Sequence, residues 1–322
     1  MSLPPLDLDL VVRSHGWYDL PPFEWQAKEK TLSFVFLFAS DPVKVTVHEA
    51  RELGFSYAAA ARQPPIEANL SSGDRSQGSP TAVRRAKRAL DTGRPGTMTP
   101  AVRRVVDRVL NLDADLSHFH SLCAARRAEG FAWIARRGAG RILRAPTLFE
   151  DAAKVLATTN CTWELTKVMV KNLIGAFGRG GAFPDAAFVA GLSEARLRNE
   201  IRVGYRAPYF AAFAEKVASE KLDLAGWEDP ARPDEEVEKD IRSLKGFGPY
   251  AADTLGRLLN RHGKLGLDSW SRKKVAGLRF GGRRVKDSRV EKLYRPFGRH
   301  AGLAFWLDVT RDWHGRKEKL WP

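Results

Sequence analysis

Residues 239–270, KDIRSLKGFGPYAADTLGRLLNRHGKLGLDSW, contain two helical patterns separated by a short glycine turn. Apolar residues recur at helical spacing over residues 234–244, and acidic residues crowd the first turn of this predicted helix. The turn Gly-Phe-Gly at 246–248 ends it, and Pro249 stands where a second helix begins, since proline lacks only an N–H that would be unpaired there. The stretch therefore predicts a helix, a hairpin and a second helix.

The hairpin has the properties of an anion-binding site. Gly246 and Gly248 flank the single apolar residue Phe247, which lets the backbone turn tightly and leaves amide groups pointing outward at a helix N-terminus. Phosphate is the natural ligand of such a terminus. We therefore predict contacts to a phosphate backbone from the hairpin and the residues beside it, namely Lys245, Gly246, Phe247, Gly248 and Tyr250.

The segment LKGFGPYAADTLGRLL followed by GLDSW resembles the signature of the HhH-GPD DNA glycosylases, a helix-hairpin-helix followed by a Gly/Pro-rich loop and an aspartate. The chain is similar above all to the alkyladenine (type II 3-methyladenine) and 8-oxoguanine DNA glycosylases. The resemblance implies that the hairpin holds DNA backbone and that Asp268 drives base excision. The residue pattern alone favours Asp268 as the N-cap of a helix formed by SWSRKKVAGL, and the two roles are compatible.

Positive charge is concentrated in the last quarter of the chain. The 322 residues include 53 Lys and Arg against 38 Asp and Glu, a formal charge of +15, with a pI of about 10.0. Residues 239–322 hold 21 basic residues against 8 acidic ones, a net charge of +13. A charge excess this localised beside a phosphate-binding hairpin predicts a polyanionic partner. With the resemblance, that partner is double-stranded DNA containing damaged bases.

The sequence has two cysteines, Cys123 and Cys161, which excludes the four-cysteine iron–sulfur cluster of some related glycosylases. We expect neither zinc nor disulfides, and interpret both cysteines as small apolar residues in a reducing compartment. The resemblance implies no required cofactor and leaves open a monovalent cation held by hairpin carbonyl groups. No apolar run is long enough to span a membrane, and the N-terminus lacks a signal-peptide pattern. We expect a monomer in the cytoplasm, nucleoid-associated in a bacterium or nuclear in a eukaryote.

The N-terminal residues 1–62 are predicted to form an antiparallel sheet lobe. LDLDLVV alternates near the start, TLSFVFLF at 31–38 reads as a strand, and VKVTVHEA at 43–50 alternates throughout. Residues 40–42 are the predicted turn between the last two strands, and the segment HGWYDLPPFEW should cross between strands with its aromatic residues in the core. Residues 63–98 are rich in Gly, Pro and Ser and are predicted to be a low-complexity insert or linker.

Residues 99–322 carry helical patterns and complete an α+β fold, with the hairpin at 244–250. Thr147 and Glu150 predict a capping box at the start of one helix. In the resemblance, Asn160 after that helix fills the gap left by an extruded base, and Tyr205 is the wedge pushed into the base stack, with Arg206 directed toward the opposite strand. The alternatives are that Asn160 only terminates its helix and that Tyr205 packs at a helix start.

The chemistry implied by the resemblance is hydrolysis of an N-glycosidic bond. A carboxylate beside C1′ stabilises positive charge on the sugar and orients or deprotonates water, and Asp268 is the candidate. Bifunctional relatives attack C1′ with a lysine on the second hairpin helix, and the matching position here is Tyr250. We therefore predict a monofunctional glycosylase; an 8-oxoguanine-type glycosylase with AP lyase activity and a non-catalytic damage-binding protein are the alternatives.

The base pocket is predicted to be aromatic. Trp270 follows Asp268 closely, and the segment AGLAFW places Phe305 and Trp306 on a helix that walls the pocket in the related enzymes. Phe305 occupies the position at which 8-oxoguanine enzymes carry a glutamine that reads the base. Aromatic faces suit an electron-poor or cationic alkylated purine, through stacking and a cation–π attraction of roughly 0.5–2 kcal/mol. The sequence thus favours alkylated purines without excluding oxidised purines or hypoxanthine.

Overall fold

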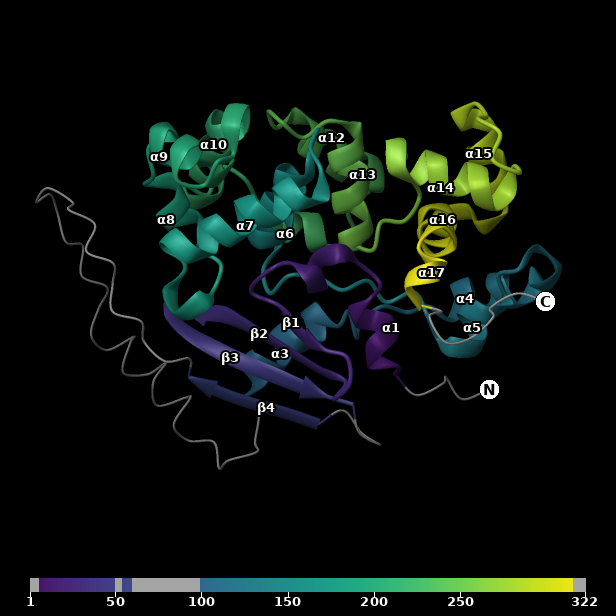
Figure 1. Ribbon diagram of the computed structural model, residues 1–322, viewed down its shortest axis with the longest axis horizontal. Coiled ribbons are helices and arrows are strands. Elements are labelled where there is room, and N and C mark those ends of the chain that lie inside the picture. Colours follow the sequence, from purple (N-terminus) through teal and green to yellow (C-terminus); the bar gives the residue numbers. More distant parts are fainter. Residues whose placement is uncertain (1–5, 50–53, 60–98, 315–322) are drawn as a thin grey trace, which may run out of the picture.

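The computed structural model describes residues 6–49, 54–59 and 99–314 (Figure 1). An antiparallel sheet is formed by strands β1 (Glu24–Gln26), β2 (Thr31–Phe38), β3 (Asp41–His48) and β4 (Gly54–Ala59), in the order β1-β2-β3-β4. The predicted insert at 63–98, including its basic stretch AVRRAKRAL, lies outside the described residues. The remaining described residues are mainly helical, so the predicted α+β fold is confirmed.

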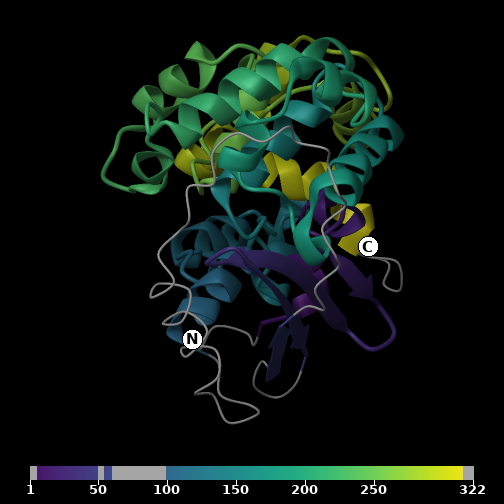
Figure 2. The ribbon, with the colours of Figure 1, turned by 90° about the vertical axis from the view of Figure 1, so that its left-hand side faces the viewer.

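Helices form most of the described chain after residue 98, and the sheet lies in the lower part of both views, below the teal and green helices of residues 148–258 (Figures 1 and 2). The N-terminal segment contributes α1 (Leu8–Val12) and the 3-10 turn η1 (Gly16–Asp19). The later helices are α3 (Pro100–Val109), α4 (Ser117–Ala125), α5 (Ala132–Arg137), α6 (Leu148–Thr158), α7 (Trp163–Phe177), α8 (Ala186–Ala190), α9 (Glu194–Asn199), α10 (Ala207–Ala218), α11 (Leu224–Glu228), α12 (Asp234–Ser243), α13 (Pro249–Leu258), α14 (Ser269–Arg279), α15 (Asp287–Tyr294), α16 (Ala301–Val309) and α17 (Arg311–His314). Shorter 3-10 turns are η2 (Arg127–Glu129), η3 (Arg179–Gly181), η4 (Gly204–Arg206) and η5 (Arg295–His300).

The β2–β3 hairpin is tighter than the sequence predicted. Phe38 pairs with Asp41, so the turn consists of Ala39 and Ser40, both with positive φ, and not of residues 40–42. Two-residue hairpin turns with positive φ match the right-handed twist of the flanking strands. Strand β3 therefore begins earlier than expected, and Pro42 is accommodated at its start, where proline is tolerated.

The alternating segment LDLDLVV forms helix α1, so its prediction as a strand was wrong. The side chain of Asp7 accepts a hydrogen bond from Leu10 N at 3.1 Å and caps the helix. The helix buries Leu8, Leu10, Val11 and Val12. A capped N-terminus and burial on consecutive positions stabilise a helical turn, whereas strand alternation over so few residues is weak evidence.

The N-terminal segment is joined to the helical core by buried hydrogen bonds. Trp17 Nε1 donates to Asp151 on α6 at 2.8 Å, and Trp306 Nε1 on α16 donates to Ser14 O at 2.7 Å. Leu143 N also donates to Ser14 Oγ at 2.8 Å. Residues from the first 20 therefore contribute to the helical core, and the boundary predicted at residue 62 stays a prediction.

Helix α6 occupies the centre of the core, and its polar residues are buried with the apolar ones. Thr147 accepts a hydrogen bond from Glu150 N, which is half of the predicted capping box. The Glu150 side chain instead pairs with Lys154 at 2.6 Å, so the reciprocal half of the box is absent. Burial raises the pKa of Glu150, and a buried charge of this kind requires its partner. In the described part of the chain, none of the helices has the length and apolar character needed to cross a membrane.

Candidate nucleic-acid interface and active site

The hairpin between α12 and α13 has the predicted backbone, and Gly246 is required for it. Phe247 N donates to Leu244 O at 3.1 Å, which closes the turn. Gly246 has a φ of 91°, and a Cβ there would lie 2.7 Å from Leu156 and 2.9 Å from Tyr209. Any side chain at Gly246 would be strained and would collide with α6 and α10. The hairpin is therefore fixed against the centre of the core.

Gly248 and Phe247 differ from Gly246 in what surrounds them. Gly248 has a φ of −75°, and no atom lies within 4 Å of an added Cβ, so open space faces this position. Phe247 is 2% exposed and packs against Phe213 at a ring distance of 5.3 Å. The prediction that Phe247 contacts a phosphate backbone was wrong, because its side chain anchors the turn in the core and its amide is already bonded within the hairpin.

The N-terminus of α13 has no side-chain cap. Gly248 is the N-cap residue and Pro249 the first helical residue, and no side-chain hydrogen bond closes the first turn. Side-chain caps close the N-termini of α6, α7, α8, α9 and α14, whereas α4, α5, α10, α12, α15 and α16 begin without one, as α13 does. An uncapped helix N-terminus presents amide hydrogens and a partial positive charge to an external anion. The exposed Lys245 adds a cation beside it.

Asp268 caps helix α14 and is only partly buried. Its Oδ1 accepts a hydrogen bond from Ser271 N at 2.7 Å, while Ser271 Oγ accepts one from Asp268 N at 2.9 Å. This reciprocal capping box confirms the N-cap interpretation of Asp268. Among the described residues, none donates a hydrogen bond to its Oδ2. One carboxylate oxygen is thus fixed by the helix, and the other accepts no hydrogen bond from the described residues.

Tyr250 lies beside Asp268 on the first turn of α13. Burial raises the pKa of its phenol, and the negative charge of Asp268 raises it further, so the hydroxyl stays protonated near neutral pH. Thr158, at the end of α6, and Thr254, one turn further along α13, border the same phenol. Tyr250 therefore presents a neutral hydroxyl group, not a nucleophile, next to the carboxylate.

The end of α6 brings the other predicted DNA contacts together. Asn160 adopts a φ of 47° just after the helix, and its Nδ2 donates to Tyr205 Oη at 3.3 Å. Asn160 is exposed. Tyr205 is 50% exposed, which is unusual for so large an aromatic side chain. Tyr209 packs edge-on against Tyr205 at 6.2 Å and also borders Gly246. The two exposed side chains thus lie on the same face as the hairpin.

Arg206 does not reach this face, so its predicted contact with the opposite DNA strand was wrong. Its side chain is 3% exposed, and its guanidinium donates to the carbonyl oxygen and, at 3.2 Å, to the hydroxyl of Thr159. The guanidinium carbon also lies 4.6 Å from the centre of the Tyr205 ring. These hydrogen bonds to Thr159 hold Arg206 inside the protein, where it supports Tyr205 and the end of α6.

The aromatic residues near Asp268 form a tryptophan cluster of Trp270, Trp306 and Trp313. The ring centres of Trp270 lie 6.1 Å from Trp306 and 5.7 Å from Trp313, and Trp306 meets Trp313 edge-on at 5.7 Å. Phe305 is fully buried against Tyr294 on the other side of α16, so its predicted place in the base pocket was wrong. Neighbouring residues of a helix point to different faces, so Phe305 and Trp306 could not both face the cluster.

Three residues of this region were missed by the sequence interpretation. Trp313 lies seven positions after Trp306, on the separate short helix α17, and Tyr209 lies four positions after Tyr205. Arg257 lies seven positions after Tyr250, and its guanidinium carbon is 4.4 Å from the centre of the Trp306 ring. The spacing of each pair is visible in the sequence, but the partner across the fold is not.

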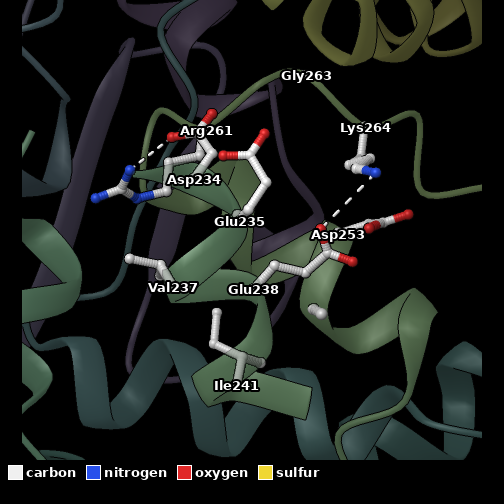
Figure 3. Close-up of a pocket in the computed structure, with 11 residues that line it drawn as sticks. Asp234, Glu235, Val237, Glu238, Ile241, Asp253, Arg261, Gly263 and Lys264 are labelled. Carbon is white, nitrogen blue, oxygen red and sulfur yellow. Dashed lines mark hydrogen bonds and ion pairs between the residues drawn. The ribbon is translucent and has the colours of Figure 1, made fainter. Parts of the chain in front are cut away.

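A separate hollow of about 190 Å³ lies between α12 and α13 on the side of α13 that faces away from Tyr250. Figure 3 shows its lining, in which Arg261 pairs with Asp234 at 2.6 Å and Lys264 with Glu238 at 3.8 Å. Neither Asp268 nor the tryptophans of the cluster line this hollow. In the described part of the chain, no cluster of three or more His, Cys, Asp or Glu side chains is arranged to hold a metal ion.

The fold is that of several solved DNA glycosylases. The chain is similar to MBOgg1 in complex with a low-affinity DNA ligand, with a TM-score of 0.67 and 15% identity over 98% of this chain and 95% of that one. It is similar to the 3-methyladenine DNA glycosylase from Archaeoglobus fulgidus, with a TM-score of 0.65 and 17% identity over 97% and 98% of the two chains. The 8-oxoguanine glycosylase/lyase of Clostridium acetobutylicum, bound to double-stranded DNA containing cytosine opposite 8-oxoguanine, gives a TM-score of 0.66 and 15% identity over 95% and 91%.

The sequence matches no protein-family model and no curated protein. At these low identities the structural likeness shows the fold alone. The chain therefore shares the fold of these three DNA glycosylases.

Proposed function

We propose that this protein is a DNA glycosylase that extrudes a damaged base from double-stranded DNA and hydrolyses its N-glycosidic bond. The observation that carries the proposal is Asp268, whose Oδ1 is fixed by Ser271 N at 2.7 Å while Oδ2 has no donor among the described residues. A carboxylate held in this way is oriented in advance for a positive charge or a water molecule. The fold shared with three glycosylase structures supports the same activity.

In the proposed reaction, the bond between C1′ and the base nitrogen breaks as positive charge develops on the sugar. The fixed carboxylate of Asp268 stabilises that charge and orients the water that adds to C1′. The electrons of the broken bond leave with the base, which takes up a proton, and the water loses one. Tyr250, protonated near neutral pH, is a hydrogen-bond donor beside these groups.

Binding to DNA is assigned to the face that carries the hairpin. The uncapped N-terminus of α13 and Lys245 bind a backbone phosphate without reading sequence. The exposed ring of Tyr205 enters the base stack, and Asn160, bonded to its hydroxyl, occupies the gap. Arg206 supports the wedge from inside the protein.

We propose a monofunctional enzyme, because the position that matches the lysine nucleophile of bifunctional relatives is Tyr250. Its hydroxyl cannot form a Schiff base with C1′. Lys245 is exposed on the hairpin, and Lys264 lies at the separate hollow paired with Glu238, so neither is beside Asp268. The reaction should therefore end at an abasic site in an intact strand.

The base is proposed to stack within the tryptophan cluster formed by Trp270, Trp306 and Trp313, and alkylated purines remain the predicted class of substrate. No cofactor takes part in a step of this proposal. A monovalent cation bound by hairpin carbonyl groups also stays a proposal; Leu244 O, which accepts the Phe247 amide, retains a second lone pair for such an ion.

The test is an excision assay on duplexes that each carry one defined damaged base. Release of a free base, with strand cleavage only after alkali, is the expected result. Strand cleavage without alkali would favour the glycosylase with lyase activity. Tight binding to damaged duplexes without release of any base would favour a damage-binding protein and contradict the proposed hydrolysis.

A further inference from the structure

Arg257 places a buried positive charge beside the tryptophan cluster. Its side chain is on the same face of α13 as Tyr250, two turns further along, and is 3% exposed. The guanidinium carbon lies 4.4 Å from the centre of the Trp306 ring, within the range of a cation–π contact. Burial lowers the pKa of Arg257 to about 10, so the group remains charged at neutral pH.

The backbone before Asp268 is shaped around this guanidinium. Arg257 Nη2 donates to Leu265 O at 2.9 Å. Gly266 has a φ of 67°, and a Cβ there would lie 2.8 Å from the same nitrogen. Glycine is therefore needed both for the backbone conformation and to leave room for the arginine. The loop that presents Asp268 and the position of the guanidinium depend on each other.

One donor of Arg257 is unused. Its Nε is buried and has no hydrogen-bond partner among the described residues, whereas Nη2 is bonded to the loop. Buried donors of charged groups almost always have acceptors, because an unpaired one loses its hydration without compensation. Because the guanidinium is bonded to the loop that leads to Asp268 and lies over Trp306, this unused donor is close to the proposed reaction site.

The tryptophan cluster already stacks with cations of the chain itself. Arg257 lies over Trp306, and Lys274 Nζ lies 5.7 Å from the centre of the Trp270 ring while it pairs with Asp312 at 2.7 Å. A cationic base stacked on Trp306 would therefore meet the positive charge of Arg257 at short range, and little of this repulsion is screened because the guanidinium is buried. The charge of Lys274 is compensated by Asp312.

We propose that Arg257 determines the substrate class of this site, selecting a neutral extruded base whose carbonyl oxygen accepts a hydrogen bond from the guanidinium and disfavouring cationic N-alkylated purines. The inference rests on the proposed glycosylase function. It replaces the preference for alkylated purines drawn from the sequence with a preference for neutral bases, because the attraction of aromatic faces for cations is satisfied here from within the chain.

The experiment separates charge from the carbonyl group with four kinds of duplex that differ only in the target base. Hypoxanthine, 8-oxoguanine and uracil are neutral and carry carbonyl oxygens, 7-methylguanine carries a carbonyl oxygen and a positive charge, 3-methyladenine is cationic without a carbonyl, and 1,N6-ethenoadenine is neutral without one. Single-turnover rates are corrected for spontaneous base loss measured with Asp268→Asn. The best of the neutral carbonyl bases should be excised at least about tenfold faster than the other three kinds. Equal or faster excision of 7-methylguanine, 3-methyladenine or 1,N6-ethenoadenine would overturn the inference.

Two variants of Arg257 test the residue itself. For each variant, the readout is the excision rate of the neutral carbonyl base divided by that of 7-methylguanine. Arg257→Met removes the charge and the hydrogen-bond donor but keeps a side chain of similar bulk. It should lower the ratio at least about tenfold. A purely structural role would lower both rates together and leave the ratio unchanged, which would contradict the proposal. Arg257→Lys keeps the charge, so it should keep the discrimination against 7-methylguanine while excision of the carbonyl base slows. Loss of that discrimination in Arg257→Lys would also contradict it.

Lys274→Met is the matched control, because Lys274 also stacks on the cluster but is paired with Asp312 outside the loop. Lys274→Met should change the ratio less than twofold. A change as large as that in Arg257→Met would contradict the proposal that Arg257 in particular determines the substrate class. If the parent protein binds these duplexes and releases no base, the proposed function itself fails. Release that depends on Asp268 but favours 7-methylguanine overturns only the inference.

Discussion

The N-termini of α13 and α14 lie close together but have opposite chemistry. Helix α13 begins at a glycine without a side-chain cap, whereas α14 begins at Asp268, whose carboxylate and Ser271 form a reciprocal capping box. Both termini carry the partial positive charge of a helix dipole. At α13 that charge is left for an external anion, and at α14 it is neutralised by the carboxylate of the chain itself.

In the proposed function, the open terminus of α13 serves binding and the capped terminus of α14 serves chemistry. An open terminus binds phosphate because its amides have no internal acceptor. A capped terminus holds a carboxylate in one orientation, since one oxygen is bonded to the helix and the other is directed elsewhere. Tyr250, on the first turn of α13 and beside Asp268, connects the two.

The largest expected effect comes from Asp268→Asn. Asparagine is as good an N-cap as aspartate, so the α14 terminus should stay closed and the melting temperature should change little. Base release should fall about 10²–10⁴-fold, as expected when a charged catalytic group is removed, while affinity for abasic-site DNA stays equal or rises. Single-turnover excision, binding and thermal unfolding measure the three quantities. Parental activity in the variant would exclude Asp268 from the mechanism.

Gly248→Asp would give α13 the kind of cap that α14 has. The position has a φ of −75° and open space around it, so the new carboxylate can cap the helix without strain. Stability should stay equal or rise by up to about 1 kcal/mol, and affinity should fall at least about tenfold for damaged and undamaged duplexes alike. Fluorescence anisotropy across several duplexes is the measurement. A loss confined to one damaged base would contradict a phosphate-binding role.

Gly246→Val tests the other glycine of the same hairpin, where the structure leaves no room. The positive φ and the contacts with Leu156 and Tyr209 should cost about 1–3 kcal/mol of the free energy of unfolding, measured by chemical denaturation. The contrast with Gly248→Asp is the sharper result, because one variant should lose stability and the other only DNA binding. Equal stability of both variants would show that the hairpin is not fixed against α6.

The smallest expected effect concerns Tyr250 and the absent Schiff base. Borohydride should trap no covalent complex between the parent protein and DNA, because the tyrosine hydroxyl cannot form an imine with C1′. Tyr250→Lys places an amine beside Asp268; burial and the charge of Arg257 should lower its pKa toward reactivity, while the negative charge of Asp268 should raise it. Weak trapping, seen as a slowly migrating band in denaturing gels, is expected. Strong trapping by the parent would overturn the monofunctional proposal.

The sequence predicted the elements whose signals are local. The α12–hairpin–α13 motif, strand β2 and the capping role of Asp268 were all correctly predicted, because glycine, proline and strand or helix periodicity act over a few neighbouring residues. Helix α1 was predicted incorrectly because five residues are too few to distinguish alternation from a helical turn. The fold class followed from the order of these elements.

What the sequence could not predict is which side of an element each functional residue faces. Tyr205 and Arg206 are neighbours in one motif, yet one is exposed and the other buried; Phe305 and Trp306 are neighbours in another, and only Trp306 joins the tryptophan cluster. The burial of Arg257 beside Trp306 has no local signal, because its cause is the loop at Gly266 and a helix some fifty residues further along the chain. The sequence by itself determined the hairpin, the carboxylate and the excess of positive charge, since backbone geometry and composition are local properties. Only the tertiary structure decided which side chains surround that carboxylate, because burial and charge pairing depend on segments that meet after folding.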